Sequence, residues 1–171
     1  MLPDEILSVD EYKTVRDAIA DLPHVDARHQ TKIADRYHRC FSHKQSTIDV
    51  IAQVPHNGGS RPKGVGPKCL DRVKGFNDVY GRLSWDKPSI TITQYARNPA
   101  SGRYSHPEQD RGLTMREAAR LQSFPDGYLW NGSLGDIFKQ IGEAVPPLLA
   151  LAIATQIALT IKEQENNERN I

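Results

Sequence analysis

Residues 113–126 read LTMREAARLQSFPD, and local signals place both ends of a helix inside this stretch. Thr114 and Glu117 stand three residues apart, which is the spacing of a capping box, where each side chain binds a backbone N–H of the other residue. The predicted helix runs through Gln122 and ends at Pro125, because the residue before a proline disfavours helical backbone. The stretch is therefore predicted to be a capped helix, and its local signals assign it no chemistry.

The composition is that of a soluble globular protein. The chain has 171 residues, which suffices for one domain with a modest core, and it is 38% hydrophobic and 25% charged. No charged leader followed by an apolar segment and a small-residue cleavage site opens the sequence, so we predict no secretory signal. The two cysteines, Cys40 and Cys69, provide no disulfide framework. They fit a reducing cytosol, and we expect a cytoplasmic protein.

Positive charge is concentrated in the middle of the chain. The segment 28–82 carries 11 Lys and Arg against four Asp, a local charge of +7, although the whole chain is only +1. The remainder is therefore −6. This asymmetry predicts a polyanion-binding region, and the alternative is an ordinary solvated basic face. The basic residues are Arg28, Lys32, Arg36, Arg39, Lys44, Arg61, Lys63, Lys68, Arg72, Lys74 and Arg82.

The run 56–68, HNGGSRPKGVGPK, is predicted to be a loop because Gly and Pro punctuate it throughout. Its glycines allow a ligand to approach the backbone closely. The basic side chains Arg61, Lys63 and Lys68 would suit contact with nucleic-acid phosphates. A mobile surface loop without a ligand is the alternative.

Two segments after this loop, 79–83 and 89–93, are strand candidates, and the second alternates polar and apolar residues. The turn-like residues 85–88 between them predict a β-hairpin. Its polar face would carry either DNA contacts or ordinary exposed side chains. The side chains in question are Arg82, Thr91 and Thr93.

The C-terminal helix predicted over 146–161 is apolar nearly all round. Proline is tolerated in the first turn of a helix, so Pro146 and Pro147 mark its start. Its only polar side chains are Thr155, Gln156 and Thr160. A helix of this kind is buried in a large core or in a membrane. The segment is shorter than the roughly 20 apolar residues of a membrane span and contains a glutamine, so we expect a partner subunit rather than a membrane.

Two longer stretches resemble conserved motifs of the DNA (cytosine-5) methyltransferases. Residues 111–126, RGLTMREAARLQSFPD, resemble the ninth motif of that family, and residues 140–147, QIGEAVPP, resemble the tenth. Shorter segments that resemble other parts of the family lie at residues 15–23, 80–83, 88–93 and 106–109. The resemblance covers residues 12–24 and 75–161, while residues 28–74 fall where the family has its variable target-recognition region.

The motifs that carry the family's chemistry are missing from this sequence. The family binds S-adenosylmethionine through a Phe-x-Gly-x-Gly loop, and its nucleophile is the cysteine of a Pro-Cys-Gln motif. Cys40 stands in His-Arg-Cys-Phe and Cys69 in Pro-Lys-Cys-Leu, so neither matches the nucleophile. The chain therefore resembles the small subunit of a split methyltransferase from a bacterial restriction–modification system. A larger subunit would carry the catalytic cysteine and most of the S-adenosylmethionine site, and this chain alone is predicted to be inactive.

The resemblance also implies roles for residues that are present. Arg116, Glu117 and Arg120 of the ninth motif would be structural, and no catalytic residue is predicted in this chain. After the tenth motif the chain would cross to the partner's catalytic domain, beside the cofactor. The cofactor contacts implied there are Glu143 and Ala144, although the family usually has Asn in place of Glu143.

The cluster His38-x-Cys40-x-x-His43 has the residue types of a zinc site but no fourth ligand at a recognisable spacing. We therefore predict ordinary surface or core residues and no metal.

The predicted fold class is α+β, with a small target-recognition domain containing β-hairpins and C-terminal helices that complete the partner's α/β domain. The predicted parts are a linker region at 1–27, the recognition domain at 28–126 and a docking segment at 127–171. The predicted function is that of a subunit that recognises double-stranded DNA and completes the cofactor pocket of a heterodimeric cytosine methyltransferase. The alternative is a stand-alone or decayed DNA-binding module without catalytic duty.

Overall fold

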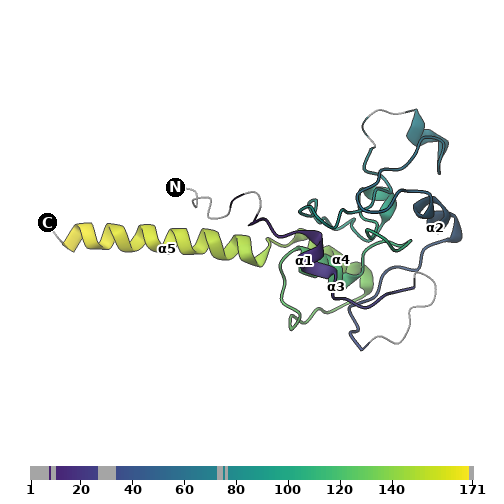
Figure 1. Cartoon of the computed structure of the whole chain (residues 1–171). Coiled ribbons are helices and arrows are strands. Elements are labelled where there is room, and N and C mark those ends of the chain that lie inside the picture. Colours follow the sequence, from purple (N-terminus) through teal and green to yellow (C-terminus); the bar gives the residue numbers. More distant parts are fainter. Residues whose placement is uncertain (1–7, 9–10, 27–33, 73–74, 76, 170–171) are drawn as a thin grey trace. The chain divides into compact units, whose positions relative to one another are not determined.

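The structure is a computed structural model, which describes residue 8 and residues 11–26, 34–72, 75 and 77–169 (Figure 1). The chain divides into two compact units, one formed by Lys13–Ala144 and the other containing Val145–Ile171. Its helices are α1 (Val15–Ile19), α2 (Gln45–Ala52), η2 (Lys68–Asp71), η3 (Pro99–Ser101), α3 (Met115–Leu121), α4 (Leu134–Glu143) and α5 (Pro147–Arg169).

Helix α3 is the predicted capped helix, and the prediction is confirmed. The Glu117 backbone N–H donates to the Thr114 hydroxyl at 3.1 Å, and the Thr114 N–H donates to the Glu117 carboxylate at 2.8 Å. The helix ends at Leu121 and Gln122 caps it, after which Ser123 takes a left-handed conformation with φ 63° ahead of Pro125. Most of α3 is buried, including the charged residues Arg116 and Glu117, so the helix lies inside the unit.

Helices α1 and α4 both pack against α3 (Figure 1). Helix α1 lies in the segment 15–23 that resembles the family, and Thr14 and Asp17 cap it in the same way as Thr114 and Glu117 cap α3. Helix α4 lies where no helix was predicted, although Ser133 and Asp136 form a third capping box at its start. The apolar residues Ile137, Phe138 and Ile141 of α4 are buried in the main core. This core also contains Val15, Ile19, Tyr37, Leu83, Trp85, Ile92, Ala96, Tyr104, Leu113, Met115, Ala118, Ala119 and Trp130.

A second, smaller core lies around α2, which was also not predicted. Its buried residues are Val50, Ile51, Val54, Val79 and Tyr80, and Val65, Leu70 and Ala100 pack against them. No side chain caps the N-terminus of α2. The helix is therefore held by tertiary packing rather than by a strong local signal.

The described residues contain isolated bridges but no strand. Ser105 bridges Arg82 in parallel and Gly112 in antiparallel orientation. Within the predicted strand 79–83, the Leu83 N–H donates to the Ser105 carbonyl at 2.9 Å, rather than to the predicted hairpin partner 89–93. The α+β class with β-hairpins, and the division at residues 27 and 126, stay predictions. The compact unit Lys13–Ala144 takes in parts of all three predicted segments.

Helix α5 begins at Pro147, one residue after the predicted start, and continues past the predicted end at Ile161 to Arg169. Its large apolar side chains are exposed, from 41% for Ile153 to 63% for Leu148. By length and composition, the helical stretch Leu134–Asn166 is the one candidate membrane span among the described residues. That stretch includes α4, whose apolar face is buried in the main core, and Ala144 breaks it with extended backbone. The 18-residue apolar window in this stretch has no buried residue, so it lies outside the buried face of α4.

Candidate nucleic-acid interface

Arg61 stabilises residues 61–72, here named the basic loop, by hydrogen bonds within the loop. The Arg61 guanidinium donates to the Asp71 carboxylate at 2.9 Å and to the Val65 carbonyl at 2.7 Å, and its side chain is only 7% exposed. The Gly64 N–H donates to the same carboxylate at 3.0 Å, from a left-handed backbone with φ 86°. The hydrogen bond from Arg61 is the main cause that lowers the pKa of Asp71. The predicted DNA contact Arg61 therefore organises the loop instead of facing outward.

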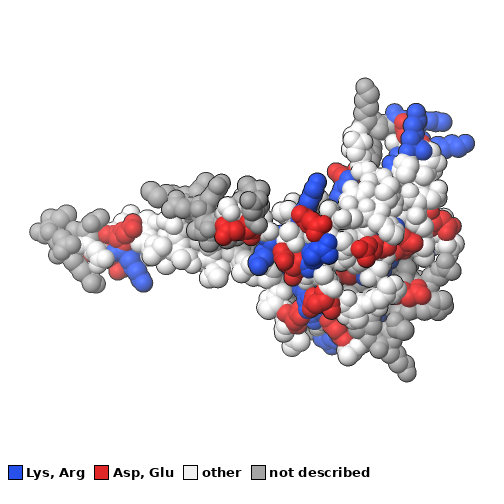
Figure 2. All heavy atoms as spheres, viewed as in Figure 1, with Lys and Arg blue, Asp and Glu red and all other residues white. Residues whose placement is uncertain are grey.

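The outer side of the basic loop carries exposed cations. Val65 and Leu70 pack against the second core, while Lys63, Lys68 and Arg72 are exposed. Figure 2 shows the Lys and Arg side chains gathered at the upper right, where this loop lies. The predicted irregular backbone of 56–68 is confirmed, since these residues form turns and coil up to η2. The basic residues Arg28, Lys32 and Lys74 lie outside the described residues.

Arg82, a predicted DNA contact, is fully buried. Its guanidinium donates to the carbonyls of Ile51 at 2.8 Å, Val54 at 3.0 Å, Gln109 at 2.9 Å and His106 at 3.2 Å, and it pairs with Asp110. An arginine has five N–H donors, and all five are used here. Arg82 thus ties the end of α2 to residues 106–110, and it leaves no N–H for DNA in this structure. The alternating pattern of the sequence could not reveal this, because the acceptors are carbonyls remote in sequence.

The threonines of the predicted hairpin differ in their accessibility. Thr91 is exposed, whereas Thr93 is half-buried and shares a hydrogen bond with the Tyr104 hydroxyl at 3.1 Å. The Tyr104 hydroxyl also contacts the Thr91 carbonyl at 3.2 Å. Tyr95, just beyond them, is an exposed aromatic residue at 54%. Segment 91–95 therefore offers polar and aromatic side chains on a backbone that Tyr104 fixes from behind.

The predicted cofactor segment lies directly against this backbone. A Cβ built on Gly142 of α4 would stand 2.0 Å from the Gln94 nitrogen and 2.1 Å from the Thr93 carbonyl carbon, so only glycine fits there. The Gln122 side-chain amide donates to the carbonyls of Ile92 and Ile141, each at 3.1 Å. The segment 91–95 and the end of α4 are thus clamped together.

Glu143 and Ala144, the predicted cofactor contacts, follow Gly142 at the end of α4. Glu143 is exposed, and Ala144 is half-buried with extended backbone. The structure thus brings Thr93 close to the predicted cofactor segment. Lys63 and Lys68 lie instead on the basic loop, which packs on the second core.

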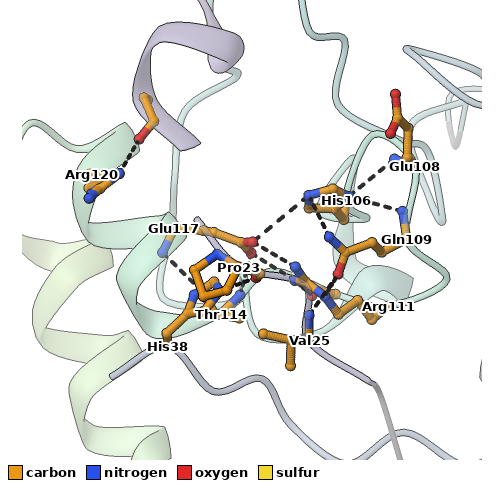
Figure 3. A network of polar contacts seen from close by, with 12 residues as sticks. Pro23, Val25, His38, His106, Glu108, Gln109, Arg111, Thr114, Glu117 and Arg120 are labelled. Carbon is orange, nitrogen blue, oxygen red and sulfur yellow. Dashed lines mark hydrogen bonds and ion pairs between the residues drawn. The ribbon is translucent and has the colours of Figure 1, made fainter. Parts of the chain in front are cut away.

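A buried polar network underlies α3 (Figure 3). The Arg111 guanidinium donates to both Glu117 carboxylate oxygens, at 2.8 and 2.7 Å, and each side chain is 1% exposed. Burial alone would raise the pKa of Glu117, but the charge and hydrogen bonds of Arg111 outweigh it and hold that pKa at about 2. Glu117 also caps α3, so the network is structural.

Two histidines complete this network. His38 Nε2 donates to the Pro23 carbonyl at 2.7 Å, because a carbonyl only accepts, and its Nδ1 shares a hydrogen bond with the Thr114 hydroxyl at 3.0 Å. His106 Nδ1 accepts from the Gln109 N–H at 2.9 Å. Burial lowers the pKa of His106 to about 3. Its approach to Glu117 at 3.9 Å is therefore not an ion pair at neutral pH.

The side chains of His38, Cys40 and His43 have different surroundings. His43 Nε2 accepts from the Gly112 N–H at 3.1 Å, while His38 faces Pro23 and Thr114. Cys40 is buried, and burial raises the pKa of its thiol to about 11, so it holds no thiolate at neutral pH. Within the described ranges, no group of three or more His, Cys, Asp or Glu residues could hold a metal ion.

The arginines of α3 bind acids of other segments. Arg116 donates to Asp35 at 2.5 and 3.2 Å, and Arg120 donates to Asp21 and Asp126, each at 2.6 Å. The hydrogen bond from Arg120 is the main cause that lowers the pKa of Asp126. These ion pairs join α3 to the segments around it, so both arginines bind acids of the chain itself.

Residues 3–159 match the family of C-5 cytosine-specific DNA methylases, so the chain belongs to this family. It is 38% identical to the type II methyltransferase M1.HphI of Haemophilus parahaemolyticus over 86% of this chain and 37% of that protein. It is 48% identical to M.AgeI of Thalassovita gelatinovora over 71% of this chain and 28% of the relative. For the type II methylase M.HgiDII of Herpetosiphon aurantiacus the identity is 32%, over 94% and 47%. The chain thus spans less than half the length of these relatives.

Proposed function

We propose that this chain is the DNA-recognition and cofactor-pocket-completing subunit of a DNA (cytosine-5) methyltransferase. The observation that carries the proposal is the clamp of Gln122, which joins segment 91–95 to the end of α4. A segment that faces DNA and a segment that faces the cofactor are then parts of one rigid unit. Such a unit suits an enzyme that must hold a base and a methyl donor together.

The reaction is the transfer of a methyl group to C5 of a cytosine that is flipped out of a specific duplex site. S-adenosylmethionine supplies the methyl group when bound. The nucleophile comes from a separate larger subunit, since Cys40 is buried and protonated and Cys69 does not stand in a Pro-Cys-Gln motif. This chain alone is inactive.

The residues at the end of α4 fit one edge of a cofactor site and no more than that. The exposed Glu143 carboxylate is a hydrogen-bond acceptor that suits an ammonium or hydroxyl group of the cofactor, and the small Ala144 permits close approach. The described residues contain no strand followed by a glycine-rich loop that would hold the rest of the molecule. The larger subunit therefore binds most of the cofactor.

Helix α5 is the docking element of this heterodimer. From Pro147 to Ile161 its side chains are apolar nearly all round, which is typical of a helix inside a core rather than one with a single buried stripe. We propose that α5 packs in the α/β domain of the larger subunit. The complex is soluble and cytoplasmic and needs no membrane.

The DNA contacts in this proposal are Lys63 and Lys68 on the basic loop, with Thr91 and Thr93 on segment 91–95. Arg61 contributes to DNA binding only by stabilising the basic loop. Arg82 is not among the proposed DNA contacts, because its N–H donors are used within the chain.

The test is co-expression of this chain with the adjacent larger methyltransferase gene, followed by mapping of methylated cytosines in the host DNA. We expect a stable 1:1 complex and methylation at one short site, and neither chain alone should methylate. A Leu151→Glu, Ile157→Glu variant should abolish the complex, whereas Lys162→Ala, which leaves the apolar surface intact, should not. Methylation without complex formation, or a complex without methylation, would refute the split enzyme.

The alternative is a stand-alone DNA-binding module without catalytic duty, and the exposed cations of the basic loop favour it. It requires the chain alone to be soluble, monomeric and able to bind duplex DNA, with affinity that falls as salt rises. It also requires that no larger subunit restore methylation.

A further inference from the structure

A pocket of about 410 Å³ borders segment 91–95, since Ile90, which directly precedes that segment, is one of its lining residues. Asn57 and Lys87 also line the pocket, and both are exposed. The described lining residues include no Asp or Glu, and Asp86, next to Lys87 in sequence, is paired with Arg16 at 2.8 Å. The pocket therefore suits a ligand that accepts hydrogen bonds.

The backbone at Asn57 is fixed before any ligand binds. Its N–H donates to the Pro107 carbonyl at 2.9 Å, and the carbonyl of the next residue, Gly58, accepts from the Arg103 guanidinium at 2.8 Å. Both residues take a left-handed conformation, with φ 51° at Asn57 and 92° at Gly58. Glycine, asparagine and aspartate tolerate this conformation best, so the Asn-Gly sequence suits this turn.

The carboxamide of Asn57 has a fixed orientation as well. The Trp85 N–H donates to Asn57 Oδ1 at 2.8 Å, and the Ser84 hydroxyl donates to the same oxygen at 3.2 Å. A backbone N–H only donates, so the atom that faces Trp85 is the oxygen, and its two acceptor positions are both used. No described residue accepts a hydrogen bond from the NH2 group of Asn57. Asn57 therefore offers a ligand two N–H donors and no acceptor.

The pocket also has an apolar part. Leu83, Pro88 and Ile90 line it, and Leu83 is 1% exposed whereas Ile90 is 36% exposed. A ligand for this pocket combines an acceptor for Asn57 with an apolar group for Ile90. The major-groove edge of thymine has both, an O4 acceptor and a C5 methyl group. Cytosine presents a donor, adenine places a donor beside its acceptor, and guanine has two acceptors but no apolar group.

We infer that Asn57 donates to the O4 atom of a thymine in the major groove of the target duplex, with the thymine methyl group against Ile90. Lys87 contacts an adjacent phosphate, which positions the protein without reading sequence. DNA as the ligand rests on the function proposed above, whereas the donor-only character of Asn57 and the apolar wall are properties of the pocket alone. Asn57 is thus a specificity-determining residue of the recognition subunit.

The test is selection of a randomised duplex pool by the full-length chain, alone and together with the larger subunit. We expect one position of the selected site to be thymine. Replacing that thymine by deoxyuridine removes only the methyl group and should weaken binding about 4-fold, as for one buried methyl group. Replacing it by cytosine exchanges the acceptor for a donor and should weaken binding about 10-fold or more.

Two variants separate the hydrogen bond from the methyl contact. Asn57→Asp keeps an acceptor for the Trp85 N–H and tolerates the left-handed backbone, so its thermal midpoint should not change. It presents oxygen in place of N–H donors, so the selected base should change from thymine towards cytosine. Ile90→Ala should bind the thymine and deoxyuridine duplexes equally and still reject cytosine.

Two further variants are controls. Lys87→Ala should lower the slope of log K against log salt by about 1, as for one lost phosphate contact, and should keep the thymine preference. Asn131→Asp makes the same charge change at an exposed asparagine that is not among the lining residues of this pocket. It should leave the thymine preference unchanged.

A thymine preference that persists in Asn57→Asp would overturn the inference, and so would equal binding of the thymine and deoxyuridine duplexes by the unchanged chain. Equal weakening of all sequences by Asn57→Asp would show that Asn57 contacts a phosphate instead. Methylation at a site without a preferred thymine would overturn the inference and leave the proposed function standing. Thymine-specific binding that Asn57→Asp abolishes, without methylation by the complex, would refute the split enzyme alone, and a complex that binds no duplex would refute both.

Discussion

Helices α3 and α5 reverse the usual relation between polarity and burial. Helix α3 contains Arg116, Glu117 and Arg120, yet most of it is buried and its charged groups are paired. Helix α5 is apolar from its first turn and its large side chains are exposed. The comparison teaches that charge placed to satisfy neighbouring segments can sit at the centre of a fold, whereas apolar surface can be reserved for another molecule.

The largest effect should come from breaking the buried pair beneath α3. Arg111→Ala leaves the Glu117 carboxylate buried without its main partner, which costs about 3–5 kcal/mol. We expect a large fall in the thermal midpoint or loss of the folded unit, measured by circular dichroism. Arg16→Ala removes an ion pair whose partners are 52% and 64% exposed, and it should change stability little. A mild effect of Arg111→Ala would contradict the central role of this pair.

The next largest effect on stability should come from the close contact between α4 and segment 91–95. Gly142→Ala puts a methyl group about where the backbone of residues 93–94 lies, and overpacking of this kind costs about 1–3 kcal/mol. The methyl group of Gly135→Ala in the same helix meets only the Ser133 Oγ, at an ordinary van der Waals distance of 3.8 Å, and should instead stabilise the helix by up to about 1 kcal/mol. Chemical denaturation of the two variants measures the difference. Equal effects would mean that the close contact is absent in solution.

Acid should weaken the polar network in two steps. The pKa of His106 is about 3 in the folded chain against 6.5 in an unfolded one, so the unfolded state binds a proton first as pH falls below 6.5. The pKa of Glu117 is about 2 against 4.5, so its contribution is complete above pH 4.5 and is lost below it. Stability should therefore decline by roughly 1–3 kcal/mol between pH 6.5 and 4.5 and fall further below that. In His106→Gln the first decline should become smaller, and burial of His43, which also lowers the pKa of that imidazole, should account for the remainder. Urea titrations across this pH range would reveal the difference.

The smallest effect on stability should come from α5. Replacing Leu151 and Ile157 by Glu changes exposed side chains, so the unit Lys13–Ala144 should keep its stability within about 0.5 kcal/mol. The same variant should lose the complex with the larger subunit. A variant that is as stable as the unchanged chain but forms no complex would sharpen the contrast with Arg111→Ala. Unfolding of the variant would instead show that α5 belongs to the core of this chain.

Local signals in the sequence were sufficient to predict some helices but not others. A capping box located α3, and the two prolines Pro146 and Pro147 located the start of α5 to within one residue. The same capping signal also stands at α1, as Thr14 with Asp17, and at α4, as Ser133 with Asp136 ahead of a buried apolar face. Helix α2 has no cap and is rich in β-branched residues, so it could not be predicted from local signals.

The candidate site was predictable in its outline but not in the role of each residue. Gly and Pro located the loop at 56–68, but basic composition could not separate Arg61 and Arg82, which bind carbonyls and carboxylates of the chain itself, from the outward-facing Lys63 and Lys68.

The single amide of Gln122 has a thermodynamic implication for the assembled enzyme. Because its two N–H groups are shared between the carbonyls of Ile92 and Ile141, neither segment can move without straining the other. If binding of one molecule changes the free energy of this contact, the affinity for the second molecule changes, and the coupling is the same in both directions. Nucleic acid and methyl donor should then bind cooperatively, each strengthening the other by the same factor, and Gln122→Ala should reduce that factor towards one.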